Sequence, residues 1–316
     1  MDRLLVGDVG FGKTEVAINA IFMMATQGFQ SLFLAPTTLL SSQHFKSLQE
    51  RFADVNISIG HIDRTIKAKA KKQYLEEFEN GNLDVIVGTH SLLNVKAKNL
   101  GLFIVDEEHK FGVKQKEKIK DISKNTHILS MSATPIPRSL NLALSKIKQI
   151  DYLNTPPMDR QDIRTYVKEY DEAIIKTAIL RELKRGGQLF YIHNRISSLD
   201  IKKQDLLDIL PNLRILVLHS KIPADISENE MIKFTNKQYD ILLATSIIES
   251  GIHMPNVNTI LIEDSNHFGI ADLHQLRGRV GRSKREGFCY FLVADTEKIT
   301  DDAKKRLLSL ERNSGL

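Results

Sequence analysis

A lysine and a threonine follow a glycine-rich stretch near the start of the chain, in a pattern that suits phosphate binding. The stretch matches G-x-x-x-x-G-K-T and, with the next residue, comprises Gly7, Asp8, Val9, Gly10, Phe11, Gly12, Lys13, Thr14 and Glu15. Glycines let successive backbone amides point at phosphate oxygens, and the amino end of a following helix adds positive potential. Lys13 would meet the β and γ phosphates of ATP, while the Thr14 hydroxyl would ligate Mg²⁺.

A second group of polar residues directly follows the apolar stretch 101–105. It consists of Asp106, Glu107, Glu108 and His109. Ligands of open α/β sheets bind at the carboxyl ends of parallel strands, so Asp106 is expected to hold Mg²⁺ and Glu107 to orient or deprotonate the attacking water. An acidic cluster alone usually indicates a solvated loop, but its pairing with the glycine-rich stretch favours the catalytic interpretation.

Arginines alternate with glycines in a third group, in the second half of the chain. The group contains Gln275, Arg277, Gly278, Arg279, Gly281 and Arg282. Such a loop is often ordinary basic surface. Together with a phosphate loop it predicts arginine fingers at Arg279 and Arg282, which are worth roughly 10³–10⁵ in the rate of phosphoryl transfer. If both halves contact one nucleotide, ATP would close the cleft between them and hydrolysis would open it.

Short apolar runs alternate with helix-length patterns and would position these groups. Uniformly apolar runs indicate a parallel sheet that is covered on both faces. In the first half the expected strands are 3–6, 31–35, 84–87, 102–106 and 128–132, and the expected helices are 13–27, 39–52 and 66–79. In the second half a helix over 173–184 precedes expected strands at 188–193, 214–218, 240–244, 259–263 and 288–293.

The paired prolines Pro156 and Pro157 interrupt this alternation, because neither a helix nor a central strand accommodates them. We therefore expect one α/β domain over 1–153, a linker over 154–162 and a second domain over 163–316. Both sheets should be mostly parallel, with helices on both faces.

The composition of the chain limits its possible partners and its cellular location. The chain of 316 residues is 42% hydrophobic and carries a formal net charge of +5, which permits a polyanionic partner without requiring one. No apolar run approaches the roughly 18 residues of a membrane span, so no membrane association is expected. The one cysteine, Cys289, lies in an apolar run and suggests a buried strand in a reducing cytoplasm.

The motifs resemble those of superfamily 2 helicases and translocases from one end of the chain to the other. Besides the three groups above, the resemblance rests on the segments 35–40, 87–90, 132–134 and 244–251. It implies two tandem RecA-like domains and an ATPase whose nucleotide site includes Gly251. It also implies that Thr38, Thr89, His90 and Thr245 touch the DNA backbone, which gives the sequence-independent grip that a motor needs.

Segments 7–17, 106–113, 133–138 and 267–283 look more narrowly like the family of bacterial transcription-repair coupling factors (Mfd). That resemblance implies a double-stranded DNA translocase that displaces stalled RNA polymerase and recruits the excision-repair protein UvrA. The related RecG branch usually has Ser where this chain has Phe11 and Gln where it has Glu108.

Two features depart from the family. His253 stands where the family usually has an acidic residue. The chain also lacks the upstream adenine-recognising segment and the modules that bind RNA polymerase and UvrA, so we interpret it as a motor-core fragment with weak nucleotide affinity and slow hydrolysis by itself.

Two alternatives stay open at this point. One is a RecG-like helicase that remodels replication forks. The other is a nucleotide-binding scaffold whose ATPase has decayed, although the intact set of Lys13, Asp106, Glu107, Arg279 and Arg282 speaks against decay.

Overall fold

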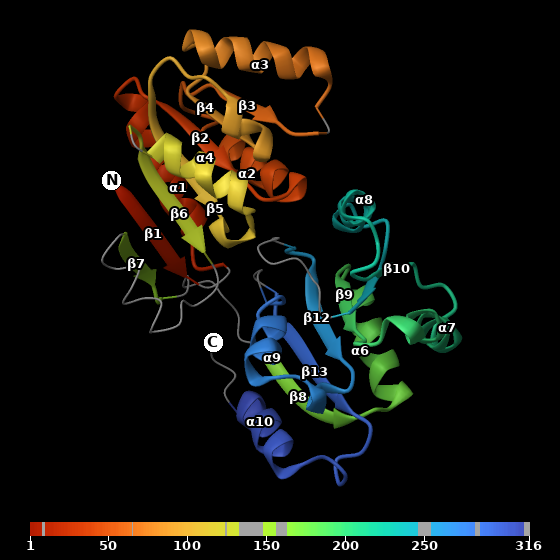
Figure 1. The fold of residues 1–316 in the computed structure, drawn as a ribbon. Helices are drawn as coiled ribbons and strands as arrows, with labels where there is room; N and C mark the ends of the chain where they lie inside the picture. The colour runs from red at the N-terminus through yellow and green to blue at the C-terminus, as the bar shows by residue number, and fades with distance from the viewer. Residues whose placement is uncertain are drawn as a thin grey trace. The chain divides into compact units, whose positions relative to one another are not determined.

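The computed structural model describes residues 1–7, 10–64, 66–123, 125–132, 148–155, 163–245, 254–281 and 285–312. The chain divides into two compact units, Met1–Pro157 and Met158–Leu316 (Figure 1). The boundary lies inside the range 154–162, while the exact extents of the two domains stay predictions.

A parallel sheet forms the centre of unit 1. Its strand order is β3-β4-β2-β5-β6-β1-β7, and every described neighbouring pair is parallel. The carboxyl ends of these strands therefore lie along one edge of the sheet. The strands are β1 (Asp2–Gly7), β2 (Gln30–Leu34), β3 (Ile59–Ile62), β4 (Val85–Gly88), β5 (Leu100–Asp106), β6 (His127–Ser132) and β7 (Gln149–Leu153).

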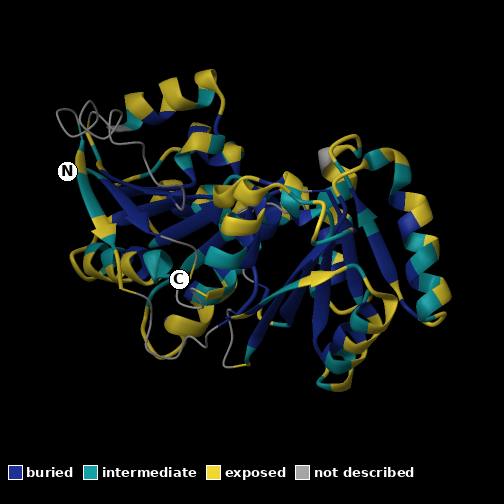
Figure 2. Cartoon of the chain, turned by 90° about the horizontal axis from the view of Figure 1, so that it is seen from below, coloured by how far each residue is buried: buried dark blue, intermediate teal, exposed yellow. Residues whose placement is uncertain are grey.

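Helices cover both faces of this sheet because alternate strand residues point to opposite sides. Phe33 packs into a core with α1 and α2, whereas its neighbours Leu32 and Leu34 pack on the other face with α3, α4 and η1. Figure 2 shows that the strands are mostly buried. The helices are α1 (Lys13–Thr26), α2 (Thr38–Arg51), α3 (Ala68–Asn80), α4 (Val113–Ser123) and the 3-10 helices η1 (His90–Asn94) and η2 (Glu108–Lys110).

Unit 2 has its own parallel sheet, in the order β10-β11-β9-β12-β13-β8. Helices α6 and α7 share a core on one face, and on the other face Phe234 of α8 stacks on Phe190 of β9. The strands are β8 (Ile163–Glu169), β9 (Gln188–Ile192), β10 (Ile215–Leu218), β11 (Ile241–Ala244), β12 (Val257–Ile262) and β13 (Gly287–Val293). The helices are α6 (Glu172–Lys184), α7 (Leu199–Ile209), α8 (Ala224–Thr235), α9 (Ile270–Arg277), α10 (Asp301–Arg312) and the 3-10 helices η3 (Ile196–Ser198) and η4 (Ser265–His267).

The structure confirms the predicted α/β class and its parallel, helix-covered sheets. It also confirms that Cys289 is a buried residue of β13. Three further strands, β3, β7 and β8, did not stand out in the sequence. The apolar-run criterion misses them because β7 and β8 lie at sheet edges with partly exposed residues, and the short β3 contains Gly60 and His61.

The two units repeat one plan. The strand orders match position for position when β3-β4-β2-β5-β6-β1 is set beside β10-β11-β9-β12-β13-β8. Gln30 opens β2, and its amide donates to the backbone oxygens of Phe78 and Leu83 at 2.8 and 2.7 Å. Gln188 opens β9 and donates in the same way to Phe234 and Tyr239, at 2.7 Å each.

The first βα connection is where the plans differ. In unit 1 it runs from Gly7 to Lys13 through the glycine-rich loop, whereas in unit 2 β8 and α6 are joined by Tyr170 and Asp171 alone. The Asp171 carboxylate accepts a hydrogen bond from the backbone amide of Ala173 at 2.7 Å and so caps α6.

Candidate nucleotide-binding site

The glycine-rich loop joins β1 to α1 at the carboxyl edge of the unit 1 sheet. Gly10 and Gly12 have φ of 85° and 90°, a left-handed conformation that strains other residues. A Cβ on Gly7 would lie 2.9 Å from the Cβ of Leu153 in β7, so the close packing of β1 also requires glycine. Asp8 and Val9 lie outside the described residues. The described glycines thus permit the turn that the sequence predicts.

The first turn of α1 directs positive groups toward this loop. Gly12 provides no side-chain cap for the helix, and the amino end of a helix carries partial positive charge. Lys13 returns over the loop, where its Nζ donates to the backbone oxygen of Gly7 at 2.5 Å. Thr14 and Phe11 are half-buried beside it, while Glu15 is exposed and pairs with Arg51 of α2 at 2.5 Å.

Two adjacent buried carboxylates end the central strand β5. Asp106 is 6% exposed and Glu107 is 2% exposed. Burial of a carboxylate is costly unless it is paired. Asp106 Oδ2 lies 2.8 Å from His44 Nε2, and Glu107 Oε2 lies 3.3 Å from His109 Nδ1. Glu107 also has a left-handed φ of 49°, and its backbone amide donates to Met131 of β6 at 2.9 Å.

Glu108 faces a different environment. Burial raises the pKa of its carboxyl group, but the Lys148 ammonium at 3.1 Å and a hydrogen bond with Ser130 outweigh burial, so this pKa lies below its usual value. Glu108 is thus held as an anion by a structural ion pair with Lys148, apart from the pair Asp106 and Glu107.

The sheet brings the loop and the carboxylates to one edge. β6 lies between β1 and β5, with Val6 beside Ser132 and Asp106 beside Met131. Strands lie about 4.8 Å apart, so two strand spacings put Gly7 and Asp106 on the order of 10 Å from each other.

A magnesium nucleotide fits this donor set. The Thr14 hydroxyl and the Asp106 carboxylate supply the hard oxygen ligands that Mg²⁺ takes. Within the described residues no group of three or more His, Cys, Asp or Glu could hold a metal ion. Mg²⁺ usually completes its coordination with phosphate oxygens and water.

The predicted DNA-contact residues of unit 1 lie at the same edge. Thr38 begins α2 directly after β2, and Thr89 and His90 follow β4. Thr38 and Thr89 are 4% and 7% exposed, whereas His90 is exposed. The contacts of these three residues with the DNA backbone stay predictions.

In unit 2 Thr245 follows β11 and is 5% exposed. Its hydroxyl has no hydrogen-bond partner within the described residues. Gly251 of the same motif lies outside the described residues, as does His253.

The arginine motif of unit 2 begins in the last turn of α9 and continues beyond the end of this helix. Gln275 is exposed on this helix, whereas Arg279 is 4% exposed. Arg277 is fully buried, and it donates to the Leu310 backbone oxygen at 3.0 Å. Burial lowers the pKa of the Arg277 guanidinium. Arg277 therefore anchors α9 to α10, and Arg282 lies outside the described residues.

Sequence reasoning did not single out a polar cluster at the carboxyl edge of unit 2. Glu263 Oε2 lies 2.7 Å from His193 Nδ1, and Glu263 Oε1 lies 2.9 Å from Lys202 Nζ. His193 Nε2 in turn lies 2.7 Å from Ser198 Oγ. Burial raises the pKa of Glu263, but hydrogen bonds from His193 and Lys202 outweigh it and hold this pKa below its usual value.

His44 was also missed. It lies on the inner face of α2, three residues after buried Ser41 and four before buried Leu48. A polar residue within an otherwise apolar helix stripe is the signal that could have revealed it.

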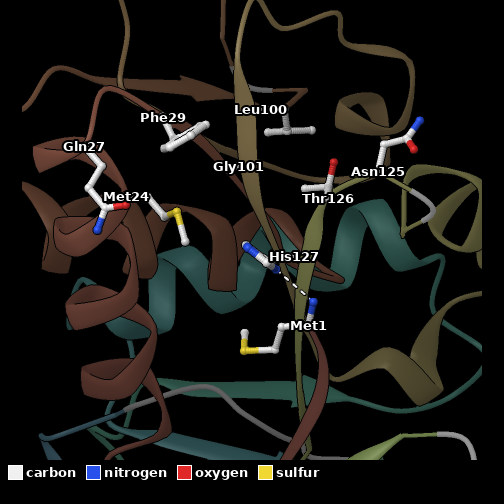
Figure 3. Close-up of a pocket in the computed structure, with 9 residues that line it drawn as sticks. All are labelled: Met1, Met24, Gln27, Phe29, Leu100, Gly101, Asn125, Thr126 and His127. Atoms are coloured by element: carbon white, nitrogen blue, oxygen red, sulfur yellow. Dashed lines mark hydrogen bonds between the residues drawn. The ribbon is translucent and has the colours of Figure 1, made fainter.

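A cavity of about 440 Å³ lies at the opposite, amino edge of the unit 1 sheet (Figure 3). Met24, Phe29 and Leu100 line it, and His127 Nδ1 there lies 2.8 Å from the Met1 amino group. None of the predicted site residues lines this cavity. It is therefore separate from the phosphate site.

Comparison with known proteins identifies matches along the chain. Residues 1–143 match the DEAD/DEAH box helicase family, and residues 171–284 match the helicase conserved C-terminal domain. None of the helices in the described ranges combines the length and apolar character that crossing a bilayer requires.

Curated relatives and a solved structure extend this similarity. The transcription-repair-coupling factor of Helicobacter pylori strain J99 is 57% identical over 316 residues, which is 100% of this chain and 32% of the relative. The factor of Escherichia coli K12 is 45% identical over 97% of this chain and 27% of its own length. The chain thus spans about a third of these relatives. RecG bound to a three-way DNA junction matches with a TM-score of 0.85 and 35% identity, over 100% of this chain and 42% of RecG.

Proposed function

Because the chain belongs to the helicases that pair a DEAD/DEAH box domain with a conserved helicase C-terminal domain, we propose that it is the ATP-hydrolysing core of a double-stranded DNA translocase of the transcription-repair-coupling type. Identity along the whole chain to factors with that name supports the specific assignment.

One observation carries the ATPase proposal. The glycine-rich loop after β1 and the buried pair Asp106 and Glu107 after β5 lie at the same edge of one parallel sheet. A phosphate loop without nearby carboxylates could bind nucleotide but would have no group to hold the metal or orient water.

The residues of unit 1 take distinct roles in this proposal. The loop amides and Lys13 bind the phosphates, and Thr14 and Asp106 hold Mg²⁺, which neutralises phosphate charge when bound. Glu107 orients the attacking water and accepts its proton. The buried position of Glu107 excludes bulk water from its surroundings, which strengthens such contacts.

Unit 2 contributes positive charge in the same scheme. We assign Arg279 and Arg282 as arginine fingers, which stabilise charge that develops in the transition state. Gln275 and Gly251 complete the proposed nucleotide contacts.

We further propose that the DNA backbone is contacted by four residues, Thr38, Thr89, His90 and Thr245. Hydroxyls and amides that bond phosphate oxygens hold any sequence, which suits movement along a duplex. As partners we propose RNA polymerase and UvrA, because the relatives are named transcription-repair-coupling factors.

A second candidate is a RecG-like fork remodeller. The similarity to RecG bound to a three-way junction favours it. Strand displacement on a forked substrate without movement on plain duplex would select this candidate.

The first test measures ATP hydrolysis with and without duplex DNA across a salt series. We expect turnover to rise with duplex. The logarithm of the duplex affinity should fall linearly with the logarithm of the salt concentration, because counterions are released from phosphates. Turnover that is insensitive to both would reject the translocase proposal.

Glu107→Gln is the sharpest variant for the ATPase. We expect kcat to fall by about 10²–10⁴ because the amide cannot accept the proton, while ATP affinity is retained. Glu117→Gln on the exposed face of α4 is the matched control and should keep normal turnover. Equal, low turnover in the parent chain and Glu107→Gln would instead support a scaffold with a decayed site.

A further inference from the structure

His44 connects the predicted DNA-binding end of α2 to the predicted metal carboxylate. It lies in the second turn of α2, is 6% exposed, and stacks on Phe33 of β2 with 4.4 Å between ring centroids. Its Nε2 lies 2.8 Å from Oδ2 of Asp106. Because an ionised carboxylate only accepts hydrogen bonds, the proton of this bond resides on Nε2.

This hydrogen bond fixes the orientation of the Asp106 carboxylate. Both partners are buried, where a hydrogen bond is stronger than in water and a lost bond is not replaced by solvent. The stacked Phe33 ring limits the rotation of the imidazole. Groups that orient a metal ligand in this way commonly change metal affinity or activity about 10–100-fold when they are removed.

Helix α2 has defined contacts at its amino end. Thr37 caps it by accepting a hydrogen bond from the Leu40 amide at 3.3 Å, and Ser41 Oγ lies 2.8 Å from His61 Nε2. Thr38, the predicted DNA contact, is six residues before His44, or about 9 Å along the helix axis. A helix transmits a displacement over that distance because its backbone hydrogen bonds are continuous.

We propose that His44 is a positioning residue, and that contact with the DNA backbone at the amino end of α2 acts on ATP hydrolysis through the hydrogen bond from His44 to Asp106. This inference rests on the proposed function. It adds a route by which DNA stimulates turnover, with one residue that carries it.

The test compares His44→Gln with His44→Asn in the full chain. The Gln amide reaches as far as the imidazole Nε2 and can donate to Asp106, whereas the Asn side chain is one methylene shorter and cannot. Both variants keep a polar group of similar chemistry. His127→Gln, an exposed residue at the amino edge of the same sheet, is the matched control.

Two measurements are made on each variant. Electron paramagnetic resonance gives the affinity for Mn²⁺ in the presence of a non-hydrolysable ATP analogue, with and without duplex DNA. Turnover gives the ratio of kcat with duplex to kcat without it. Duplex affinity, measured separately, should change by less than about twofold because His44 does not touch DNA.

For His44→Asn we expect Mn²⁺ affinity to fall about 10-fold and the stimulation by DNA to disappear. His44→Gln should restore most of both. Full stimulation and unchanged Mn²⁺ affinity in His44→Asn would overturn the inference, and so would equal losses in His44→Gln and His44→Asn.

These outcomes are distinct from failure of the proposed function. If the parent chain shows no stimulation by duplex, the translocase proposal fails. If the parent is stimulated and His44→Asn is stimulated equally, only the role of His44 is wrong.

Discussion

At the residue scale, the acidic residues differ in what surrounds them. Asp106 is paired with His44, and Glu107 with His109, while Glu108 is held by Lys148. The sequence predicts that this cluster follows a strand, because the apolar run before it is plain. It does not predict the partners, because His44 and Lys148 are 62 and 40 residues away and are brought near only by the sheet.

The contribution of Glu263 to stability is expected to depend on pH. Its pKa is lowered in the folded protein, so its hydrogen bonds to His193 and Lys202 add stability above the ordinary glutamate pKa of about 4.3, and this stability is lost as the pH falls further. At pH 7 Glu263→Gln should lower the free energy of unfolding by about 1.5–3 kcal/mol.

Urea denaturation of both forms at pH 7 and pH 4 measures this difference. The gap between the parent chain and Glu263→Gln should narrow at the lower pH. Glu297→Gln, an exposed residue, serves as the control. A gap that stays constant with pH would show that the amide substitution acts through packing instead.

At the element scale, a strand that is apolar along most of its length is well predicted, whereas the mixed strands β3, β7 and β8 are not. β4 and β5 are buried along most of their length, whereas β8 contains buried, half-buried and exposed residues. Whereas the predicted helices α1, α2, α3 and α6 have 13 or 14 residues, the helices α7 to α10 have 8 to 12. Their positions depend on packing against the second sheet, which local periodicity does not contain.

The cap of α2 can be tested at the same scale. Thr37→Ala removes the hydroxyl that accepts from the Leu40 amide and should cost about 1 kcal/mol of stability. Thr37→Ser should keep most of this contribution. Chemical denaturation followed by circular dichroism measures both.

Thr26→Ala provides the matched control, because the Thr26 hydroxyl donates to a carbonyl at the exposed end of α1 and caps no amide. Its effect should stay within about 0.5 kcal/mol. A loss in Thr37→Ala no larger than in Thr26→Ala would mean that the cap contributes little.

At the scale of the whole molecule, the sequence predicts two α/β domains because the alternation of strands and helices stops at a pair of prolines and then resumes. The pattern of apolar runs does not give the order of the strands within each sheet, because that order depends on which strands pair. The repeated role of Gln30 and Gln188 becomes visible only when their acceptors are known.

Each unit has its own sheet and its own cores, so we expect residues 1–157 and 158–316 to fold when produced separately. Far-ultraviolet circular dichroism should show cooperative unfolding for both, a suitable probe because the chain has no tryptophan. Residues 1–157 should retain binding of ATP phosphates, and residues 158–316 should show none. Binding by the second piece alone would contradict the placement of the phosphate site.

The carboxylate of Asp171 occupies the end of α6 that corresponds to the amino end of α1, where we propose that phosphates bind. A helix end that is already satisfied by its own anion repels another one. Although the architecture is present twice, the molecule should therefore take up one nucleotide per chain, and a calorimetric titration should reach saturation at a stoichiometry of one. The proposed phosphate site would then belong to unit 1 alone, while the corresponding helix end of unit 2 is neutralised by Asp171.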